Sequence, residues 1–237
     1  MLKKMLVVAA LSVIGTTGAF ASDEARAAAK EVIELKDGST VYIFKDGKMG
    51  MEDKTVGISP VGCAVFAYNY LDIDWQEAAH GRAPAVATGI KRLWPDRLVF
   101  TYQGDGDLAC IGTCETIHAL NRGENIPIIF INNAIYGMTG GQISPTSPKG
   151  SYGSTAPYGA VERPFNLSRM VKAAGATYVA RSTAYHVQHL TDMVANGLDN
   201  KGFSFIEAMV QCPTAYGRKN KMGSPADMMK WMQENAV

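Results

Sequence analysis

Two polar motifs, each directly after an apolar run, constrain the fold of this chain most strongly. Gly104-Asp105-Gly106-Asp107 follows the run Leu98 to Tyr102, and Asn132-Asn133 follows the run Ile126 to Ile131. The spacing fits a strand, a glycine turn that carries a carboxylate, a crossover helix that starts near Asp107, and a second strand that ends in an amide. Units of this kind build parallel sheets.

The side chains at these two turns predict a magnesium site. In an open parallel sheet ligands sit outside the carboxyl ends of the strands, so Asp105 and Asn133 are expected at the same edge. Mg²⁺ prefers oxygen ligands and commonly shares its coordination sphere with the phosphate oxygens of a bound ligand. We expect the ion to be bound by the Asp105 carboxylate, the Asn133 side-chain carbonyl and a backbone carbonyl just beyond, at Ile135.

The first turn also predicts a diphosphate site. Gly104 and Gly106 flank Asp105, and glycines let the backbone approach a ligand closely. The helix that starts near Asp107 would direct amide hydrogens toward the phosphates. The alternative is a pair of structural turns, because Asp-Gly sequences are common turn formers.

The C-terminal part alternates between predicted helices and strands. Helices are expected at Leu167 to Ala174 and His186 to Asn200, and strands at Thr177 to Arg181 and Phe203 to Val210. The stretch Ser144 to Pro164 is rich in Ser, Pro, Gly and Tyr and is predicted to be a long loop that orders over a ligand or partner. This alternation predicts an α/β fold with a doubly wound, mostly parallel sheet.

The motifs resemble those of a known family. Gly104-Asp105-Gly106 followed by Asn132-Asn133 resembles the thiamine diphosphate motif, and the sequence from about Thr55 to Val237 resembles the beta subunit of 2-oxoacid:ferredoxin oxidoreductases. The other matching stretches are Pro60-Val61-Gly62-Cys63, His80-Gly81-Arg82-Ala83-Pro84, the run from Tyr102 to Gln142 with Ile135-Tyr136-Gly137-Met138-Thr139-Gly140-Gly141-Gln142, and Gln211-Cys212-Pro213-Thr214.

The resemblance implies a sheet of the thiamine diphosphate-binding type, with Mg²⁺ as a second cofactor. It implies that the stretch Gly137 to Gln142 wraps the coenzyme and that Met138 supports its bent form; the alternative for Met138 is a core gap-filler. For His80 and Arg82 the alternative to a site role is a surface loop or a structural ion pair. The residues implied in coenzyme binding are Val61, Gly62, Cys63, Ala64, His80, Arg82, Gly104, Asp105, Gly106, Asp107, Asn133, Gly137, Met138, Thr139, Gly140, Gly141 and Gln142.

The resemblance implies oxidative decarboxylation of a 2-oxoacid, with coenzyme A as acyl acceptor and ferredoxin as electron acceptor. No catalytic residue is expected in this chain, because the family's alpha subunit supplies the glutamate that activates the coenzyme. That alpha subunit is the implied partner, and gamma and delta subunits are further candidates. Gly217-Arg218-Lys219-Asn220 resembles the 2-oxoglutarate members; branched-chain 2-oxoacids and pyruvate are the alternative substrates. A formal net charge of +1 and the lack of basic runs argue against a nucleic-acid partner.

Four cysteines bear on iron-sulfur binding. The resemblance implies that Cys63 and Cys212 bind a 4Fe-4S cluster together with a Cys-Pro-Gly-Cys pair nearer the N-terminus, and that pair is absent from the sequence. Because such a cluster needs four ligands, we expect a labile cluster or none unless an unsuspected ligand completes the set. Cys110 and Cys114 have the spacing of one helix face and are expected to be buried against the sheet. A metal-binding or redox pair is the alternative for these two.

The first 21 residues resemble a secretory signal peptide. Lys3 and Lys4 precede an apolar segment from Met5 to about Val13, and Ala19-Phe20-Ala21 has small residues at the spacing of a cleavage site. The apolar segment is too short to span a membrane, and a signal anchor or a buried N-terminal helix is the alternative. A functional signal would imply the periplasm, whereas an enzyme that reduces ferredoxin is expected in the cytoplasm.

Residues 30 to 51 have the pattern of a short β-hairpin or meander. Apolar and polar positions alternate in Val32 to Leu35 and in Val41 to Phe44, and Asp-Gly pairs follow each run. Lys45 to Glu52 resembles the periplasmic copper-resistance protein K, which implies Cu(I) binding by the soft thioethers of Met49 and Met51. Ordinary strand residues are the alternative for both methionines.

Three segments are therefore expected: a signal-like segment at 1–21, a short β segment at 22–54 and a thiamine diphosphate-binding domain at 55–237. Two unrelated sequences meet near Lys54 and Thr55, which suggests a chimeric or misjoined chain. The alternative function for the whole chain is a periplasmic copper-binding fragment fused to a non-catalytic oxidoreductase domain.

Overall fold

The computed structural model describes residues 31–34, 40–43 and 54–236, which form two sheets. In the smaller sheet β1 (Glu31–Glu34) pairs antiparallel with β2 (Thr40–Ile43), as expected for a hairpin in this segment. The expected signal segment and the two methionines Met49 and Met51 lie outside the described residues. Within the part of the chain that is described, no helix combines the length and apolarity needed to cross a bilayer.

The larger sheet contains six strands that all run parallel. Their order across the sheet is β4-β3-β5-β6-β8-β7. The strands are β3 (Thr55–Pro60), β4 (Asp74–Ala78), β5 (Leu98–Gly104), β6 (Pro127–Asn132), β7 (Tyr178–Thr183) and β8 (Ser204–Met209). The predicted doubly wound α/β fold is confirmed, and this sheet is parallel throughout.

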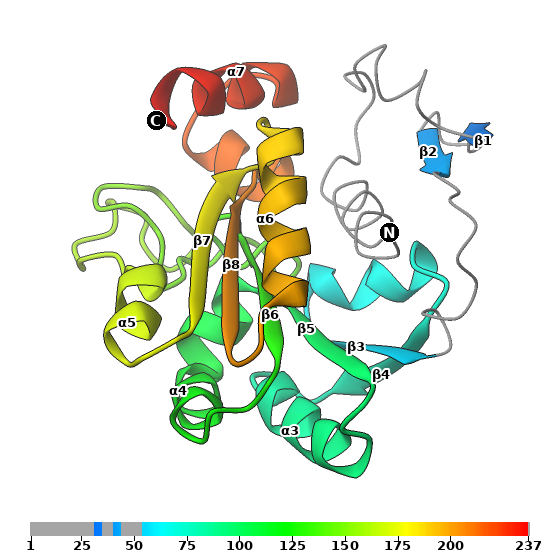
Figure 1. Ribbon diagram of the computed structural model, residues 1–237. Coiled ribbons are helices and arrows are strands. Elements are labelled where there is room, and N and C mark those ends of the chain that lie inside the picture. Colours follow the sequence, from blue (N-terminus) through cyan, green and yellow to red (C-terminus); the bar gives the residue numbers. More distant parts are fainter. Residues whose placement is uncertain (1–30, 35–39, 44–53, 237) are drawn as a thin grey trace.

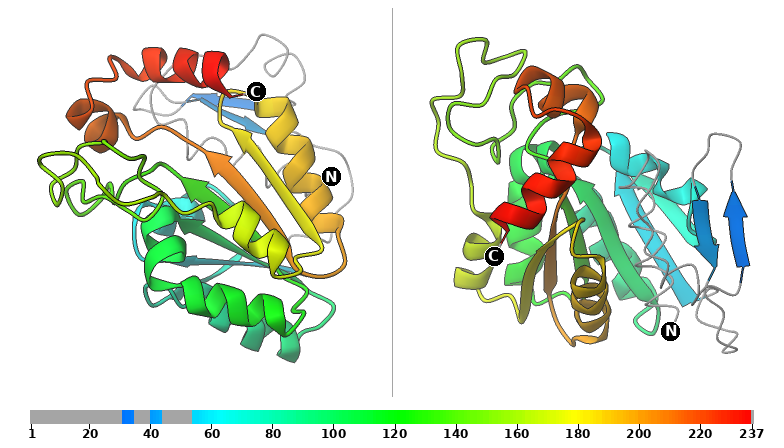
Figure 2. Two further views of the ribbon diagram at one scale, coloured as in Figure 1. Left: turned by 90° about the vertical axis from the view of Figure 1, so that its left-hand side faces the viewer. Right: turned by 90° about the horizontal axis from the view of Figure 1, so that it is seen from above.

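Helices cover both faces of the larger sheet (Figure 1, Figure 2). One face is covered by α3 (Ala83–Leu93), α4 (Thr113–Asn121) and α5 (Leu167–Ala173). The other face is covered by the 3₁₀ segment η2 (Cys63–Asn69) and by α6 (Val187–Asp199). Crossover helices on both faces are the reason that a sheet with only parallel strands is stable.

The central strands are apolar on both sides because both sides are covered. Tyr102 and Ile206 belong to the core under η2 and α6, whereas Phe130 and Phe205 belong to the core under α4 and α5. The rings of Phe130 and Phe205 lie 5.4 Å apart between centroids and join adjacent strands. This double-sided core holds the carboxyl ends of β5, β6 and β8 in fixed register.

Three further helical segments and a long loop complete the domain. A π-helical turn, η3 (Gly106–Ile111), separates β5 from α4. A second π-helical turn, η4 (Pro213–Gly217), follows β8, and α7 (Pro225–Asn235) ends the described chain (Figure 1). The segment between β6 and α5 contains only two isolated bridges, in agreement with the predicted long loop.

Candidate functional site

The candidate site lies at the carboxyl ends of four strands. β3, β5, β6 and β8 are neighbours in the sheet, and they lead into Cys63, Asp105, Asn133 and Cys212 respectively. Parallel strands present their carboxyl ends at one edge. Four segments that are far apart in the sequence therefore meet at this edge of the sheet.

Asp105 is buried at this edge, with 2% of its surface exposed. Its Oδ2 accepts hydrogen bonds from the hydroxyls of Ser144 and, at 3.0 Å, of Thr146. Burial raises the pKa of Asp105 to about 6, although the two hydroxyls act in the opposite direction. No cationic side chain among residues 54–236 pairs with this carboxylate. A divalent cation would supply the missing positive charge.

The side chains of Asn132, which ends β6, and of Asn133, which follows it, fold back over the next residues. Asn132 Oδ1 accepts from the N–H of Ala134 at 3.1 Å, and Asn133 Oδ1 accepts from the N–H of Ile135 at 3.2 Å. These side chain to backbone turns are typical of asparagine. The Thr146 hydroxyl lies 3.0 Å from Asn132 Oδ1 and 3.0 Å from Asp105 Oδ2, so Thr146 connects Asp105 to Asn132, whereas the expected pairing was with Asn133.

Ala134 has a left-handed backbone conformation between these turns. Its φ of 61° costs a residue with a Cβ about 1 kcal/mol or more relative to glycine. We predict that Ala134→Gly raises the free energy of unfolding by about 0.5–1 kcal/mol, which chemical denaturation of the purified protein would measure. Ala174→Gly is the matched control, because Ala174 has an ordinary φ of −81° and should gain nothing. Equal effects of both substitutions would contradict strain at Ala134.

The two cysteines predicted at the edge do approach each other. A Cβ added to Gly137 would lie 3.3 Å from Cys212 Sγ, 3.8 Å from Cys63 Sγ and 3.9 Å from Asn133 Nδ2. Burial, followed by the charge of Cys212, raises the pKa of the Cys63 thiol. The described residues contain no group of three or more His, Cys, Asp or Glu side chains that could hold a metal ion. Two thiols do not fit a 4Fe-4S cluster, which requires four ligands.

The prediction that Cys110 and Cys114 are buried on one helix face is wrong. Both are exposed. They belong to different segments, because Gly112 lies between the end of η3 and the start of α4. The buried positions of this region are instead Leu108, Ala109, Thr116, Ala119 and Leu120, together with the η3 residues Gly106 and Asp107.

Gly104 and Gly106 have different surroundings. A Cβ at Gly104 would have no atom within 4 Å, so there is room for a ligand beside it. A Cβ at Gly106 would lie 2.2 Å from the ring of Tyr136, whose hydroxyl donates to the Gly106 carbonyl at 2.9 Å. A diphosphate could therefore approach the backbone at Gly104, as predicted, whereas the Tyr136 ring blocks the approach at Gly106.

Asp107 and His80 form a hydrogen-bonded pair. Asp107 is buried, and one of its oxygens contacts His80 Nδ1 and accepts from the N–H of Gly81 at 2.5 Å. Its other oxygen accepts from Gln103 Nε2 at 2.6 Å. Burial raises the pKa of Asp107, and these hydrogen bonds partly offset the shift. The contacts tie the loop after β4 to the turn after β5.

Arg82 contacts the start of α4 and the end of η3. Its Nη1 forms an ion pair with Glu115 Oε1 at 2.9 Å and lies 3.4 Å from the carbonyl oxygen of Ile111. Nearly half of the Arg82 side chain is exposed. These contacts match the structural ion pair that the sequence left open as the alternative for this residue.

The predicted coenzyme stretch from Gly137 to Gln142 forms a closed loop. The N–H of Tyr136 donates to the Gln142 carbonyl at 2.9 Å, and the Thr139 hydroxyl donates to Gln142 Oε1 at 2.7 Å. Met138 is 47% exposed on this loop, so it does not fill a gap in the core. Gly140 and Gly141 have φ values of 111° and 85°, which only glycine adopts readily.

The remaining predicted residues lie beside Cys63. Val61 is 42% exposed, Gly62 has a φ of 112°, and Ala64 is buried in the core under η2. Gly62 has no atom within 4 Å of an added Cβ. The turn after β3 therefore offers open backbone next to the thiol.

Several buried polar residues connected to Asp105 were not predicted from the sequence. Ser144 and Thr146 cap Asp105, and Glu207 on β8 accepts from Asn132 Nδ2 at 2.8 Å. Glu207 is only 1% exposed. The sequence did contain a signal for Glu207, since it is an acidic residue within the apolar strand Phe203 to Val210. Charged side chains are rarely buried without a partner, so such a residue predicts buried polar contacts.

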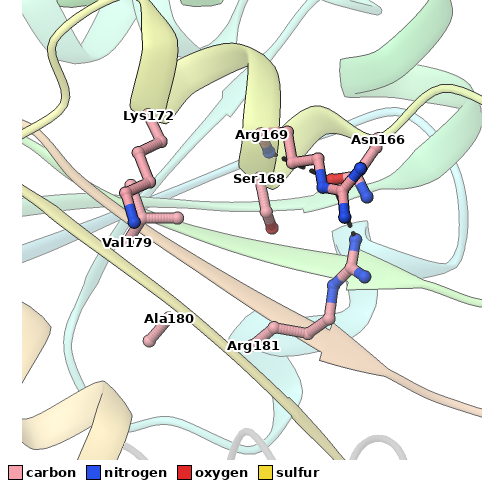
Figure 3. A pocket seen from close by; sticks show the side chains of 7 residues that line it. All are labelled: Asn166, Ser168, Arg169, Lys172, Val179, Ala180 and Arg181. Atoms are coloured by element: carbon pink, nitrogen blue, oxygen red, sulfur yellow. Dashed lines mark hydrogen bonds between the residues drawn. The ribbon is translucent and has the colours of Figure 1, made fainter.

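A pocket of about 290 Å³ lies elsewhere, between α5 and β7 (Figure 3). Asn166 connects two of its basic residues, since its Oδ1 accepts from the backbone N–H of Arg169 at 3.0 Å and lies 3.4 Å from Arg181 Nη2. None of the predicted coenzyme residues lines this pocket, whose walls are Asn166, Ser168, Arg169, Lys172, Val179, Ala180 and Arg181.

The edge residues fit Mg²⁺ and a diphosphate. Asp105 supplies a buried carboxylate that has no cationic partner among residues 54–236, Asn133 supplies an amide oxygen directly after the next strand, and the space beside Gly104 is open. Oxygen ligands of these types at a strand end suit Mg²⁺. The donor set and the room beside it are therefore compatible with a Mg²⁺-bound diphosphate.

Comparison with protein families matches residues 60–208 to "Thiamine pyrophosphate enzyme, C-terminal TPP binding domain". Residues 29–57 match "Copper resistance protein K". The two matches do not overlap, and together they agree with the two resemblances seen in the sequence.

Individual relatives point in the same direction. The 2-oxoglutarate synthase subunit KorB of Methanothermobacter marburgensis is 52% identical over 185 residues, which cover 78% of this chain and 65% of that protein. The ketoisovalerate oxidoreductase subunit VorA of Methanothermobacter thermautotrophicus is 42% identical over 179 residues, covering 70% of this chain and 38% of that protein. The chain thus spans about two thirds of the length of its 2-oxoglutarate synthase relative.

A solved structure is similar in fold as well as in sequence. It is the 2-oxoglutarate:ferredoxin oxidoreductase from Magnetococcus marinus with 2-oxoglutarate, coenzyme A and succinyl-CoA bound. The TM-score is 0.68 at 30% sequence identity, and the match covers 77% of this chain and 68% of that chain.

Proposed function

The chain belongs to the thiamine pyrophosphate enzyme family, together with the beta-type subunits of 2-oxoacid:ferredoxin oxidoreductases, and we propose that it binds Mg²⁺-thiamine diphosphate as such a subunit. The reaction is the coenzyme A-dependent oxidative decarboxylation of a 2-oxoacid with ferredoxin as electron acceptor. The partner is an alpha subunit, and the site of the reaction is the cytoplasm.

One observation carries this proposal above the others. Asp105 is a buried carboxylate at a strand end that has hydroxyl donors and no cationic partner among the described residues. It lies inside the stretch that matches the thiamine pyrophosphate family. A buried carboxylate without a cationic partner is suited to bind a divalent cation, which can also coordinate the oxygens of a diphosphate.

Each residue of the edge has a distinct task in this proposal. Asp105, Asn133 and the backbone carbonyl of Ile135 would hold Mg²⁺, and the open backbone at Gly104 would face the diphosphate. The exposed Met138 would contact the organic part of the coenzyme. Bound thiamine diphosphate supplies the electron sink that lets a 2-oxoacid lose CO₂, and the protein supplies position and electrostatics.

The substrate is proposed to be 2-oxoglutarate. Lys219 lies against the coenzyme loop, because a Cβ added to Gly141 would be 2.5 Å from Lys219 Cε. Asn220 holds the same region in place by bonding to the backbone N–H of Tyr152 at 2.7 Å and to its carbonyl at 3.1 Å. A cation near the edge suits the second carboxylate of a dicarboxylic acid. Pyruvate and branched-chain 2-oxoacids lack that carboxylate.

Mg²⁺ binding should depend on pH. The ion needs the ionised form of Asp105, and the pKa of that carboxyl is raised to about 6. The apparent Mg²⁺ affinity should therefore be constant above about pH 7 and fall roughly tenfold for each pH unit below 6. Calorimetric titration of the purified chain with Mg²⁺ and thiamine diphosphate at several pH values would measure this.

The same titration tests the proposed function itself. Thiamine diphosphate should bind in the presence of Mg²⁺ and not in the presence of a chelator. Binding of the coenzyme that is independent of divalent cations, or an affinity that stays constant down to pH 5, would count against the role of Asp105.

A further inference from the structure

A chain of hydrogen bonds connects the surface near α5 with the Asp105 carboxylate. It starts at Arg181, whose Nε and Nη2 lie 2.8 and 2.7 Å from Glu207 Oε2. It continues from Glu207 Oε1 to Asn132 Nδ2 at 2.8 Å. It ends at Thr146, whose hydroxyl oxygen lies 3.0 Å from Asn132 Oδ1 and 3.0 Å from Asp105 Oδ2.

Glu207 fixes the orientation of the Asn132 amide. All of its partners are donors, namely Arg181, the Ser168 hydroxyl and the Asn132 amide nitrogen, because a carboxylate can only accept. Figure 3 shows Ser168 and Arg181 on neighbouring elements, α5 and β7. The amide nitrogen of Asn132 must therefore face Glu207, and its oxygen must face Thr146.

Thr146 has one proton and several acceptors. Its hydroxyl can donate to Asp105 Oδ2, to Asn132 Oδ1 or to Ser144 Oγ, which lies 2.9 Å away. Ser144 already donates to Asp105 Oδ2. A hydroxyl donates to only one acceptor at a time. The direction of the Thr146 proton therefore decides whether Asp105 Oδ2 accepts hydrogen bonds from both Ser144 and Thr146 or from Ser144 alone.

We infer that Glu207 is a positioning residue that frees Asp105 for the divalent cation. By keeping the Asn132 oxygen toward Thr146, it gives the Thr146 proton an alternative acceptor when a cation binds Asp105. Without Glu207 the Asn132 amide loses the acceptor for its nitrogen and is oriented only by the N–H of Ala134, so it can turn, present its nitrogen to Thr146 and leave that proton on Asp105. This inference rests on the proposed function, because it takes Asp105 as the cation ligand.

Glu207→Gln tests the inference with little change in shape. A glutamine keeps its oxygen for Arg181 and turns its nitrogen toward Asn132, which favours the reversed amide. We expect Mn²⁺ affinity of the full chain, measured from the free Mn²⁺ signal in electron paramagnetic resonance, to fall about tenfold. Ser168→Ala is the matched control: it removes a donor to the other Glu207 oxygen, and the affinity should stay within about twofold.

A double substitution separates positioning from a general structural role. If Glu207 acts through the Thr146 proton, adding Glu207→Gln to Thr146→Val should change Mn²⁺ affinity by no more than about twofold. A residue that only supports the fold would lower the affinity by the same factor in both backgrounds. Should Glu207→Gln fail to fold, Asn132→Ala serves in its place, since it removes the alternative acceptor and should give the same tenfold loss.

The outcomes distinguish this inference from the proposed function. If the unsubstituted chain binds no Mn²⁺, the proposed function fails and the inference fails with it. If that chain binds Mn²⁺ but Glu207→Gln matches Ser168→Ala, or loses affinity equally in the Thr146→Val background, only the role of Glu207 is refuted.

Discussion

Replacement of Asp105 by asparagine should abolish Mg²⁺-dependent binding of thiamine diphosphate while making the metal-free protein more stable. Asparagine keeps the shape and an oxygen for the Ser144 and Thr146 hydroxyls, but it removes the charge that a divalent cation requires. We expect the Mg²⁺ affinity to fall on the order of 100-fold or more, since a direct ligand contributes at least as much as its supporting contacts.

The gain in stability follows from the direction of the pKa shift. The pKa of Asp105 is raised from 3.8 to about 6 by burial, so the fold favours the protonated form. Its stabilising contribution is fully present below pH 4 and is lost as the pH rises through 6. At pH 8 the ionised carboxylate costs on the order of 2 to 3 kcal/mol, and Asp105→Asn should recover much of it in denaturation without metal.

An exposed carboxylate provides the control for both effects. Asp74 pairs with Arg97 at 3.2 Å and is largely exposed. Asp74→Asn should leave Mg²⁺ affinity unchanged and alter the free energy of unfolding by less than about 1 kcal/mol. If Asp105→Asn behaves like Asp74→Asn in either assay, the assignment of Asp105 as the charged centre of the site is wrong.

Alanine substitutions at Gly104 and Gly106 should have opposite consequences for folding and binding. At Gly106 the added Cβ would lie 2.2 Å from the ring of Tyr136, so Gly106→Ala should lower the free energy of unfolding by about 2–3 kcal/mol. At Gly104 the Cβ would meet no atom within 4 Å, so Gly104→Ala should fold normally. Its methyl group would occupy the space proposed for the diphosphate and should weaken coenzyme binding at least tenfold.

This pair is measured by thermal unfolding and by calorimetric titration with Mg²⁺-thiamine diphosphate. Each variant serves as the control for the other, because Gly106→Ala tests the packing against Tyr136 and Gly104→Ala tests the space proposed for the diphosphate. If Gly104→Ala binds the coenzyme as well as the unsubstituted chain, the diphosphate does not lie beside Gly104.

Much of the sheet could be predicted from the sequence, because its strands are short apolar runs that end in turn residues. The expected strand Phe203 to Val210 corresponds to β8 (Ser204–Met209), and the expected helix His186 to Asn200 corresponds to α6 (Val187–Asp199). Strand β3 (Thr55–Pro60) is not among the strands expected from the sequence, and neither is the edge strand β4 (Asp74–Ala78). Strand β4 has mostly polar, partly exposed residues and therefore no apolar run.

The site could be predicted only in part. Asp105 and Asn133 could be predicted because each directly follows a predicted strand. A short stretch of sequence is enough to find such residues. Ser144 lies 39 residues from Asp105, and Glu207 lies 75 residues from Asn132. Contacts over such separations depend on how the strands are ordered in the sheet, which short-range patterns do not specify. The π-helical turn that places Cys110 and Cys114 on the surface leaves no pattern of its own.

The most direct test of this account is the position of a divalent cation in crystals grown with Mn²⁺ and thiamine diphosphate. An anomalous difference map should place Mn²⁺ about 2.0–2.3 Å from an Asp105 carboxylate oxygen, Asn133 Oδ1 and the Ile135 carbonyl, with two diphosphate oxygens completing most of its shell. A cation bound elsewhere, or a coenzyme diphosphate that does not approach Asp105, would contradict the account.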